Sequence, residues 1–226
     1  MIMMKILIIN SNEPEQNFLN SLLSSQDDFE VAGLARDGYD ALKLAEALQP
    51  DVAIVDFRME NISVMDLIPL IKRKSPNTAV ILLSPWDDGK RVCDALACGV
   101  SGYLLKKTDM DKLVSSVRIV HDGGCSISKG IFSRAFTALS QQAIYQKFFR
   151  TSFPSGKNNA VSSHFSQAEL RIIKFVCEGK SNKEIAENLS LSGGTVRNYI
   201  SSVMQKAGTH NRVQMAIYAF SHGLTG

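Results

Sequence analysis

Hydrophobic positions in the first half of the chain switch repeatedly between two periods. Short apolar runs lie at 5–10, 29–35, 51–57, 79–84 and 102–105. Each is followed by a segment in which apolar residues recur every three or four positions: from residue 14, then 38–49, 64–75, 87–98 and 108–122. The first pattern is typical of buried parallel strands and the second of amphipathic helices. Five such strand–helix units predict an α/β domain with a doubly wound parallel sheet in the flavodoxin-like order.

The last third of the chain shows helical spacing alone. Ser166 and Glu169 stand three positions apart, as in a capping box, and open a first helix. Further helices are predicted at 182–189, 194–207 and 212–222, with very short connections. This predicts an all-α four-helix domain that contains a helix-turn-helix.

The segment between these two parts, residues 126–162, has its own pattern. Apolar residues keep helical spacing over 131–148, whereas 152–163 is rich in Ser, Asn, Gly and Pro. We expect a connecting helix and then a flexible joint. The helix either packs on one of the domains or pairs with the same helix of a second chain. The predicted domains are thus 1–125, a linker at 126–162, and 163–226.

Charge divides the chain at the same place. Residues 1–125 hold 13 Lys and Arg against 18 Asp and Glu, whereas residues 126–226 hold 12 against 4. The net charge is therefore −5 for residues 1–125 and +8 for residues 126–226. A basic second part is suited to a polyanionic partner.

Composition excludes several classes of protein. No apolar run approaches 18 residues, which predicts no membrane contact. The opening residues lack the features of a signal peptide, so a cytoplasmic location is expected. The four cysteines fit no metal-binding spacing, and we expect reduced thiols and no metal site built on them.

The third predicted helix of the C-terminal domain carries small polar and basic residues on its outer side. Arg197, Asn198 and Ser201 are suited to bond base edges in a major groove. Other polar residues are placed to hold phosphate oxygens: Ser181, Asn182, Lys183, Ser192, Thr195 and Lys206. Double-stranded DNA is the predicted partner of this domain.

A second candidate site lies where the predicted parallel strands end. In a doubly wound sheet, ligands bind beyond the carboxyl ends of the strands. The residues at those ends are Asn10 and Ser11, Asp56, Ser84, and Lys106.

Both parts resemble known families. The stretch SNKEIAENLSLSGGTVRNYISSVMQKAG resembles the LuxR-type DNA-binding domain, over residues 163–225. The stretches DVAIVDFRM, VILLS and GVSGYLLKK resemble the receiver domain of response regulators, with Tyr103 at the switch-aromatic position. The whole chain is similar to a NarL/FixJ-type response regulator.

The resemblance implies a chemistry for the strand ends. Asp56 would be the phosphoacceptor, Lys106 would pair with the phosphoryl group, and Ser84 would bond it, with Mg²⁺ as the metal. It also implies a homodimer on paired half-sites, and a histidine kinase or another protein as the partner of the receiver.

The chain departs from the family at the first strand end. The family has two adjacent acids there, and this chain has the neutral Asn10 and Ser11. Asp56 is then the single carboxylate expected to face the metal, because Glu13 stands two residues too late. We predict weak or absent Mg²⁺ binding and weak or absent phosphorylation of Asp56. A direct ion pair between Asp56 and Lys106 would then hold one fixed state.

Three classes of function follow. The leading hypothesis is a DNA-binding transcription regulator. One alternative is a regulator that uses the receiver as a protein-binding or dimerisation module, and another is a conventional regulator activated by phosphorylation. An enzyme of the aspartyl-phosphate phosphatase kind is discounted, because Arg58 stands where a second acid is needed.

Overall fold

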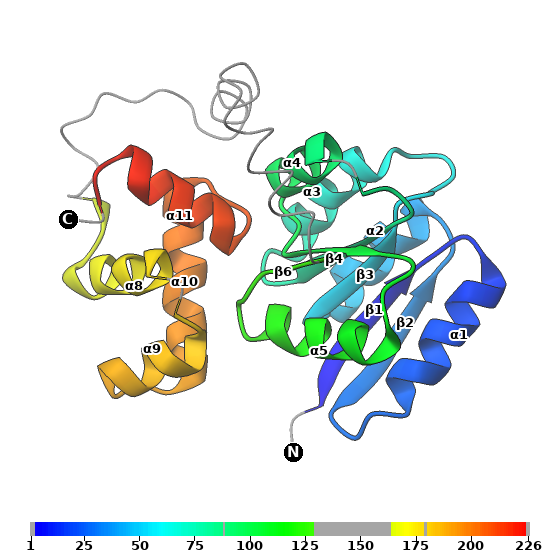
Figure 1. The fold of residues 1–226 in the computed structure, drawn as a ribbon, viewed down its shortest axis with the longest axis horizontal. Helices are drawn as coiled ribbons and strands as arrows, with labels where there is room; N and C mark the ends of the chain where they lie inside the picture. Colours follow the sequence, from blue (N-terminus) through cyan, green and yellow to red (C-terminus); the bar gives the residue numbers. More distant parts are fainter. Residues whose placement is uncertain (1–2, 88, 129–163, 179, 225–226) are drawn as a thin grey trace.

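The computed structural model describes residues 3–87, 89–128, 164–178 and 180–224. The first of its two parts alternates strands and helices, as Figure 1 shows. In chain order they are β1 (Met4–Ile9), α1 (Glu13–Ser24), β2 (Phe29–Ala35), α2 (Gly38–Leu48), β3 (Val52–Asp56), α3 (Val64–Lys74), β4 (Ala79–Ser84), α4 (Gly89–Cys98), β5 (Gly102–Leu105), α5 (Met110–His121) and β6 (Ser126–Ile127). The predicted strands and helices are confirmed, with most ends displaced by one or two residues.

The strands form one parallel sheet in the order β2-β1-β3-β4-β5-β6. The first five follow the predicted flavodoxin-like order. Side chains of successive strand residues point to opposite faces, so the sheet has two hydrophobic layers. Leu7 and Ile9 join the core under α2, α3 and α4, whereas Ile6 and Ile8 join the core under α1 and α5.

The linker was expected to start at residue 126, but residues 126 and 127 form a sixth strand. Ser126 and Ile127 pair in parallel with Gly102 and Tyr103 of β5, and the Ser128 amide donates to the Tyr103 carbonyl at 3.0 Å. These residues therefore extend the sheet. Two residues are too few to show a strand period, which is why the pattern did not predict β6. The helix expected over 131–148 and the joint at 152–163 lie outside the described residues.

The second part contains the predicted helices, drawn in yellow to red in Figure 1. They are α8 (Gln167–Cys177), α9 (Asn182–Leu189), α10 (Gly193–Ala207) and α11 (Arg212–Ser221). Val196, Ile200 and Val203 of α10 are buried in the core that these helices share, as their spacing predicted. The capping box is confirmed: the Ser166 hydroxyl accepts from the Glu169 amide, and the Glu169 carboxylate accepts from the Ser166 amide.

Candidate functional site

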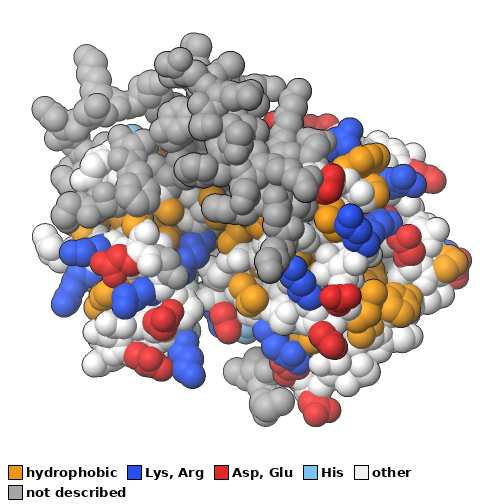
Figure 2. All heavy atoms as spheres, viewed as in Figure 1, with side chains coloured by type: hydrophobic (Ala, Val, Ile, Leu, Met, Phe, Trp, Pro, Cys, Tyr) orange, Lys and Arg blue, Asp and Glu red, His pale blue; other side chains and the backbone are white. Residues whose placement is uncertain are grey.

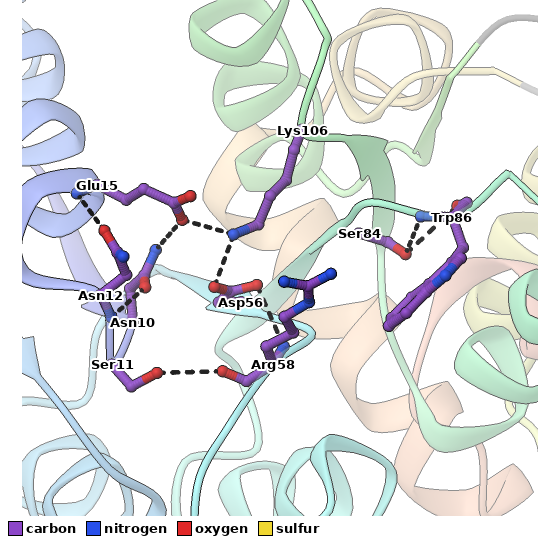
Figure 3. A network of polar contacts seen from close by, with 9 residues as sticks. All are labelled: Asn10, Ser11, Asn12, Glu15, Asp56, Arg58, Ser84, Trp86 and Lys106. Carbon is purple, nitrogen blue, oxygen red and sulfur yellow. Dashed lines mark hydrogen bonds and ion pairs between the residues drawn. The ribbon is translucent and has the colours of Figure 1, made fainter.

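Asp56 lies at the carboxyl end of β3 and is 2% exposed. One of its carboxylate oxygens, Oδ2, lies 2.8 Å from the Lys106 ammonium nitrogen. The other, Oδ1, accepts a hydrogen bond from the Arg58 amide at 3.2 Å. The geometry thus contains the direct Asp56–Lys106 ion pair that the sequence suggested (Figure 3).

A second carboxylate shares the same ammonium group. Glu15 Oε2 lies 2.5 Å from Lys106 Nζ and also accepts a hydrogen bond from Asn10 Nδ2 at 3.2 Å. Figure 3 shows Lys106 between the two carboxylates. The prediction that Asp56 alone faces this position was wrong. Glu13 pairs instead with Arg36 at 3.0 Å, outside this group.

The local structure of α1 explains why Glu15 reaches the pocket. The side chain of Asn12 caps α1 by accepting from the Glu15 amide at 3.0 Å, which places Glu15 in the first turn. Its side chain extends back toward the strand end, where Asn10 holds it. An acid three positions after an asparagine cap is the signal that sequence reasoning missed.

Electrostatics strengthen the arrangement. The hydrogen bond from Lys106 holds the pKa of Glu15 below its ordinary value, although partial burial opposes this. Burial also acts to lower the pKa of Lys106, but its bonds to Asp56 and Glu15 outweigh that effect and raise it. The ammonium is therefore charged, and it serves two carboxylates at once.

The neutral residues at the end of β1 are engaged in local bonds. Asn10 is 1% exposed, and its Oδ1 accepts from the Asn12 amide at 2.9 Å. The Ser11 hydroxyl donates to the Arg58 carbonyl at 3.2 Å, which ties this loop to the one after β3. Both residues thus hold loops together.

The donor set decides how a divalent cation would fit. Magnesium takes several hard oxygen ligands. Within the described ranges, no group of three or more His, Cys, Asp or Glu side chains stands close enough to hold a metal. A cation between Asp56 and Glu15 would have to displace Lys106 Nζ from both. The residues present therefore fit a bridging ammonium better than a bound magnesium ion.

Ser84 and Tyr103 form a separate pair beside this group. The Tyr103 ring is fully buried, and its hydroxyl lies 2.8 Å from Ser84 Oγ and 3.0 Å from the Trp86 carbonyl. Ser84 Oγ also accepts from the Trp86 amide at 3.1 Å. The Ser84 hydroxyl is thus engaged with the loop after β4.

In the C-terminal domain, several residues predicted to hold phosphates have structural partners. The Ser181 hydroxyl caps α9 and the Ser192 hydroxyl caps α10, where it also bonds the Thr195 hydroxyl. Lys206 pairs with the buried Glu169 at 2.7 Å. These contacts leave the outer surface of α9 and α10 to Lys183, Arg197 and Asn198, which are exposed.

Two of the predicted DNA contacts are turned toward the receiver. Asn182 is only 5% exposed, and its amide nitrogen lies against Gly123, just after α5. Ser201 is half-buried and lines a cavity between the two domains together with Arg197 and Asn198. Part of the predicted DNA-binding surface therefore faces the receiver in this arrangement.

The two domains are joined by hydrogen bonds that the sequence did not predict. Asn211 Nδ2 donates to the carbonyls of Leu96 and Val100, both at 3.0 Å. Gln214 Nε2 donates to the carbonyls of Leu96 and Ala97, both at 2.8 Å. Both side chains are buried, and the carbonyls that they bond lie in the last turn of α4 and just after it. An amide that bonds a distant carbonyl leaves no periodic signal in a sequence.

Comparison with known proteins agrees with this geometry. Residues 6–118 match the response regulator receiver domain, and residues 163–219 match the bacterial regulatory proteins of the luxR family. The chain belongs to the response regulators that join a receiver domain to a LuxR-type helix-turn-helix domain.

Relatives and solved structures extend over nearly the whole chain. The transcriptional regulatory protein LnrK of Bacillus subtilis is 29% identical over 223 residues, which cover 99% of each protein. LiaR of the same organism is 28% identical over 222 residues, covering 98% of this chain and 99% of LiaR. A structure of an RcsB–DNA complex has a similar fold, with a TM-score of 0.56 at 20% identity over 97% of this chain and 98% of that one. None of the helices described here has the length and apolar character needed to span a bilayer.

Proposed function

We propose that this response regulator binds double-stranded DNA as a cytoplasmic homodimer, and that its receiver does not depend on metal-assisted phosphorylation. The DNA-binding part of the proposal is supported by the LuxR-type match and by Lys183, Arg197 and Asn198 on the surface of α9 and α10. The dimer is supported by a solved structure of similar fold that is described as two RcsB dimers bound to two DNAs.

The observation that carries the second part is the position of Lys106. Its ammonium lies 2.8 Å from Asp56 and 2.5 Å from Glu15, and so a cation that bridged these two carboxylates would have to displace it. Phosphoryl transfer to a carboxylate requires neutralisation of the phosphoryl oxygens. The ammonium is already committed to Asp56, and the end of β1 provides no acid to hold a metal beside it.

A DNA-binding titration tests both parts together. The full chain is titrated with selected operator duplexes at several salt concentrations, with and without acetyl phosphate and Mg²⁺. We expect sequence-specific binding that weakens steeply with salt, because Lys and Arg displace counterions from DNA. We expect acetyl phosphate to change neither the affinity nor the mass of the protein. Labelling that disappears in Asp56→Ala would contradict the proposal for the receiver.

A variant with the acids restored provides the matched control. Asn10→Asp combined with Ser11→Asp places two carboxylates beside Asp56, and we expect this variant to gain Mg²⁺ affinity. If it gains none, the neutral strand end is not the reason for the receiver's silence.

A second candidate function is regulation through a protein partner of the receiver, a histidine kinase or another protein. It is favoured by Phe18 and Met110, which are 50% and 38% exposed and line one cavity between α1 and α5. Exposed large apolar side chains of this kind are suited to protein contacts. Lys183→Ala with Arg197→Ala separates the two functions, because DNA binding should fall whereas partner binding to the receiver should survive.

A further inference from the structure

The cavity between the two domains is lined by an unusual set of groups. It measures about 240 Å³, and residues of α3, α9, α10 and the start of α11 meet around it. Figure 2 shows the hollow between the two parts of the molecule. Its cationic lining groups are Lys72, Arg197 and Arg212, against the single carboxylate of Asp51. The lining therefore has an excess of positive charge.

Two of these cations, the buried Lys72 and the half-buried Arg212, have no acidic partner among the described residues. Lys72 is 8% exposed, and its ammonium donates to the carbonyls of Pro76 at 3.1 Å and Thr78 at 2.8 Å. Arg212 donates to Asn182 Oδ1 and to the Lys180 carbonyl. Among the described residues, neither forms an ion pair with Asp or Glu. A buried charge without a counter-charge is costly.

The pKa values of Lys72 and Arg212 reflect the cost of removing their charges from water. Burial lowers the pKa of Lys72 to about 8 and that of Arg212 to about 10. A bound anion would offset this effect for both groups.

An unpartnered donor lies at the same cavity. Asn182 Nδ2 is the one buried side-chain nitrogen or oxygen in the described part of the chain that has no hydrogen-bond partner. Exchanging the amide's oxygen and nitrogen would not help, because the oxygen accepts from Arg212 at 3.1 Å. A Cβ atom at position 123 would lie 2.4 Å from Nδ2, so Gly123 is needed for this approach. Buried donors of this kind nearly always have an acceptor.

We propose that this cavity binds a small molecule carrying a phosphate group, which pairs with Lys72 and Arg212 and accepts a hydrogen bond from Asn182. Donors approach from both domains, and this arrangement fits a tetrahedral oxyanion with several acceptor oxygens better than a planar carboxylate. The volume is several times the ~30 Å³ that one water molecule takes in the liquid, so there is room for a pyrophosphate or a nucleotide phosphate.

Binding there would compete with DNA. Arg197, Asn198 and Ser201 line the cavity and also belong to the predicted DNA-binding surface, so this consequence rests on the proposed function. The anion would stabilise the arrangement in which α10 faces the receiver. At a ligand concentration ten times its dissociation constant, the apparent DNA affinity should fall roughly tenfold.

Calorimetric titration of the full chain tests the site directly. The probes are inorganic pyrophosphate and AMP, with sodium sulfate at matched ionic strength as the control for general anion binding. We expect one saturable site for pyrophosphate or AMP, and the tighter of the two distinguishes an inorganic from a nucleotide ligand. Absence of saturable binding up to millimolar concentration, or equal binding of sulfate, would overturn the proposal.

Two variants locate the site. Lys72→Gln removes the buried cation, and Asn77→Asp adds a negative charge at an exposed position on the cavity wall without disturbing the bonds of Lys72. Each should weaken binding at least tenfold, whereas Lys43→Gln and Asn17→Asp, exposed on α2 and α1, should not. Unchanged binding in Asn77→Asp would place the anion elsewhere and overturn the proposal. DNA affinity without the anion is measured in parallel, so a failure of DNA binding is recognised separately.

Discussion

At the scale of single residues, the receiver is defined by how Lys106 is shared. The ammonium bridges Asp56 and Glu15, and the neutral Asn10 supports Glu15 from the end of β1. Asp56, Ser84 and Lys106 could be identified from their places at strand ends, because parallel strands bring those ends to one edge. Glu15 could not, because its reach depends on the angle at which α1 leaves the Asn12 cap.

Replacing Lys106 should convert the pocket into a cation site. In Lys106→Met, Asp56 and Glu15 lose their shared ammonium and are left as neighbouring carboxylates, so Mg²⁺ or Mn²⁺ affinity should rise at least tenfold, or about 1.4 kcal/mol. Trp86 is the single tryptophan of the chain, and its ring centroid lies 4.8 Å from that of Phe57, next to Asp56. Its fluorescence during cation titration is the measurement.

The matched control adds Glu15→Gln to the Lys106 variant. Loss of the second carboxylate should cancel the gain in affinity. An identical cation response in the starting chain and in Lys106→Met would show that the ammonium does not exclude the metal.

At the scale of elements, the periodic patterns predicted the helices and strands better than they predicted the contacts of individual side chains. The strands and the helices α8 to α11 follow from apolar spacing and from the capping box of Ser166. The sixth strand and the roles of Ser181 and Lys206 did not, because a polar residue near a helix end is suited equally to a cap, an ion pair or a phosphate. In the C-terminal domain, Glu169 is the partner of several of these polar residues.

Glu169 links α8 to α10 through a buried set of bonds. Its carboxylate accepts from Lys206 at 2.7 Å and from Ser202 at 2.8 Å. Burial alone would raise the pKa of Glu169, but the bonds from Lys206, Ser166 and Ser202 outweigh it and lower the pKa to about 2. A depressed folded-state pKa contributes stability above the unfolded value, near 4.5, and that stability is lost as the pH falls toward 2.

Glu169→Gln should therefore destabilise the C-terminal domain by about 2 kcal/mol at pH 6 and by less than half as much at pH 3. Calorimetric thermal unfolding of both proteins at the two pH values gives the comparison. Glu187→Gln, at an exposed position of α9, is the control and should have little effect at either pH. A Glu169→Gln effect of equal size at pH 3 would mean that the charge of Glu169 is not what stabilises the domain.

At the scale of the whole molecule, α11 holds the helix-turn-helix against α4 of the receiver. Four hydrogen bonds from Asn211 and Gln214 end on backbone carbonyls of residues 96, 97 and 100. Val213 packs against the receiver core at the same place. The domain order was predictable from composition and motif, whereas this junction depends on amides that meet carbonyls more than a hundred residues away.

Asn211→Ala combined with Gln214→Ala should separate the domains. The variant loses all four bonds. Each contributes about 1 kcal/mol, so the open population should rise by roughly three orders of magnitude. Small-angle scattering should show a larger radius of gyration, and DNA affinity should increase because Asn182 and Ser201 become accessible. Gln167→Ala, at an exposed position of α8, should change neither. Unchanged scattering by the double variant would show that these amides do not hold the two domains together.

The ammonium that bridges Asp56 and Glu15 is covalently attached to the chain. Its local concentration is therefore fixed, and neither dilution nor a chelator can remove it. Under the function proposed for the receiver, this tethered cation would keep the same charge balance whatever the supply of divalent ions in the cell. Any ligand that binds Asp56 at this edge of the sheet must therefore displace the Lys106 ammonium.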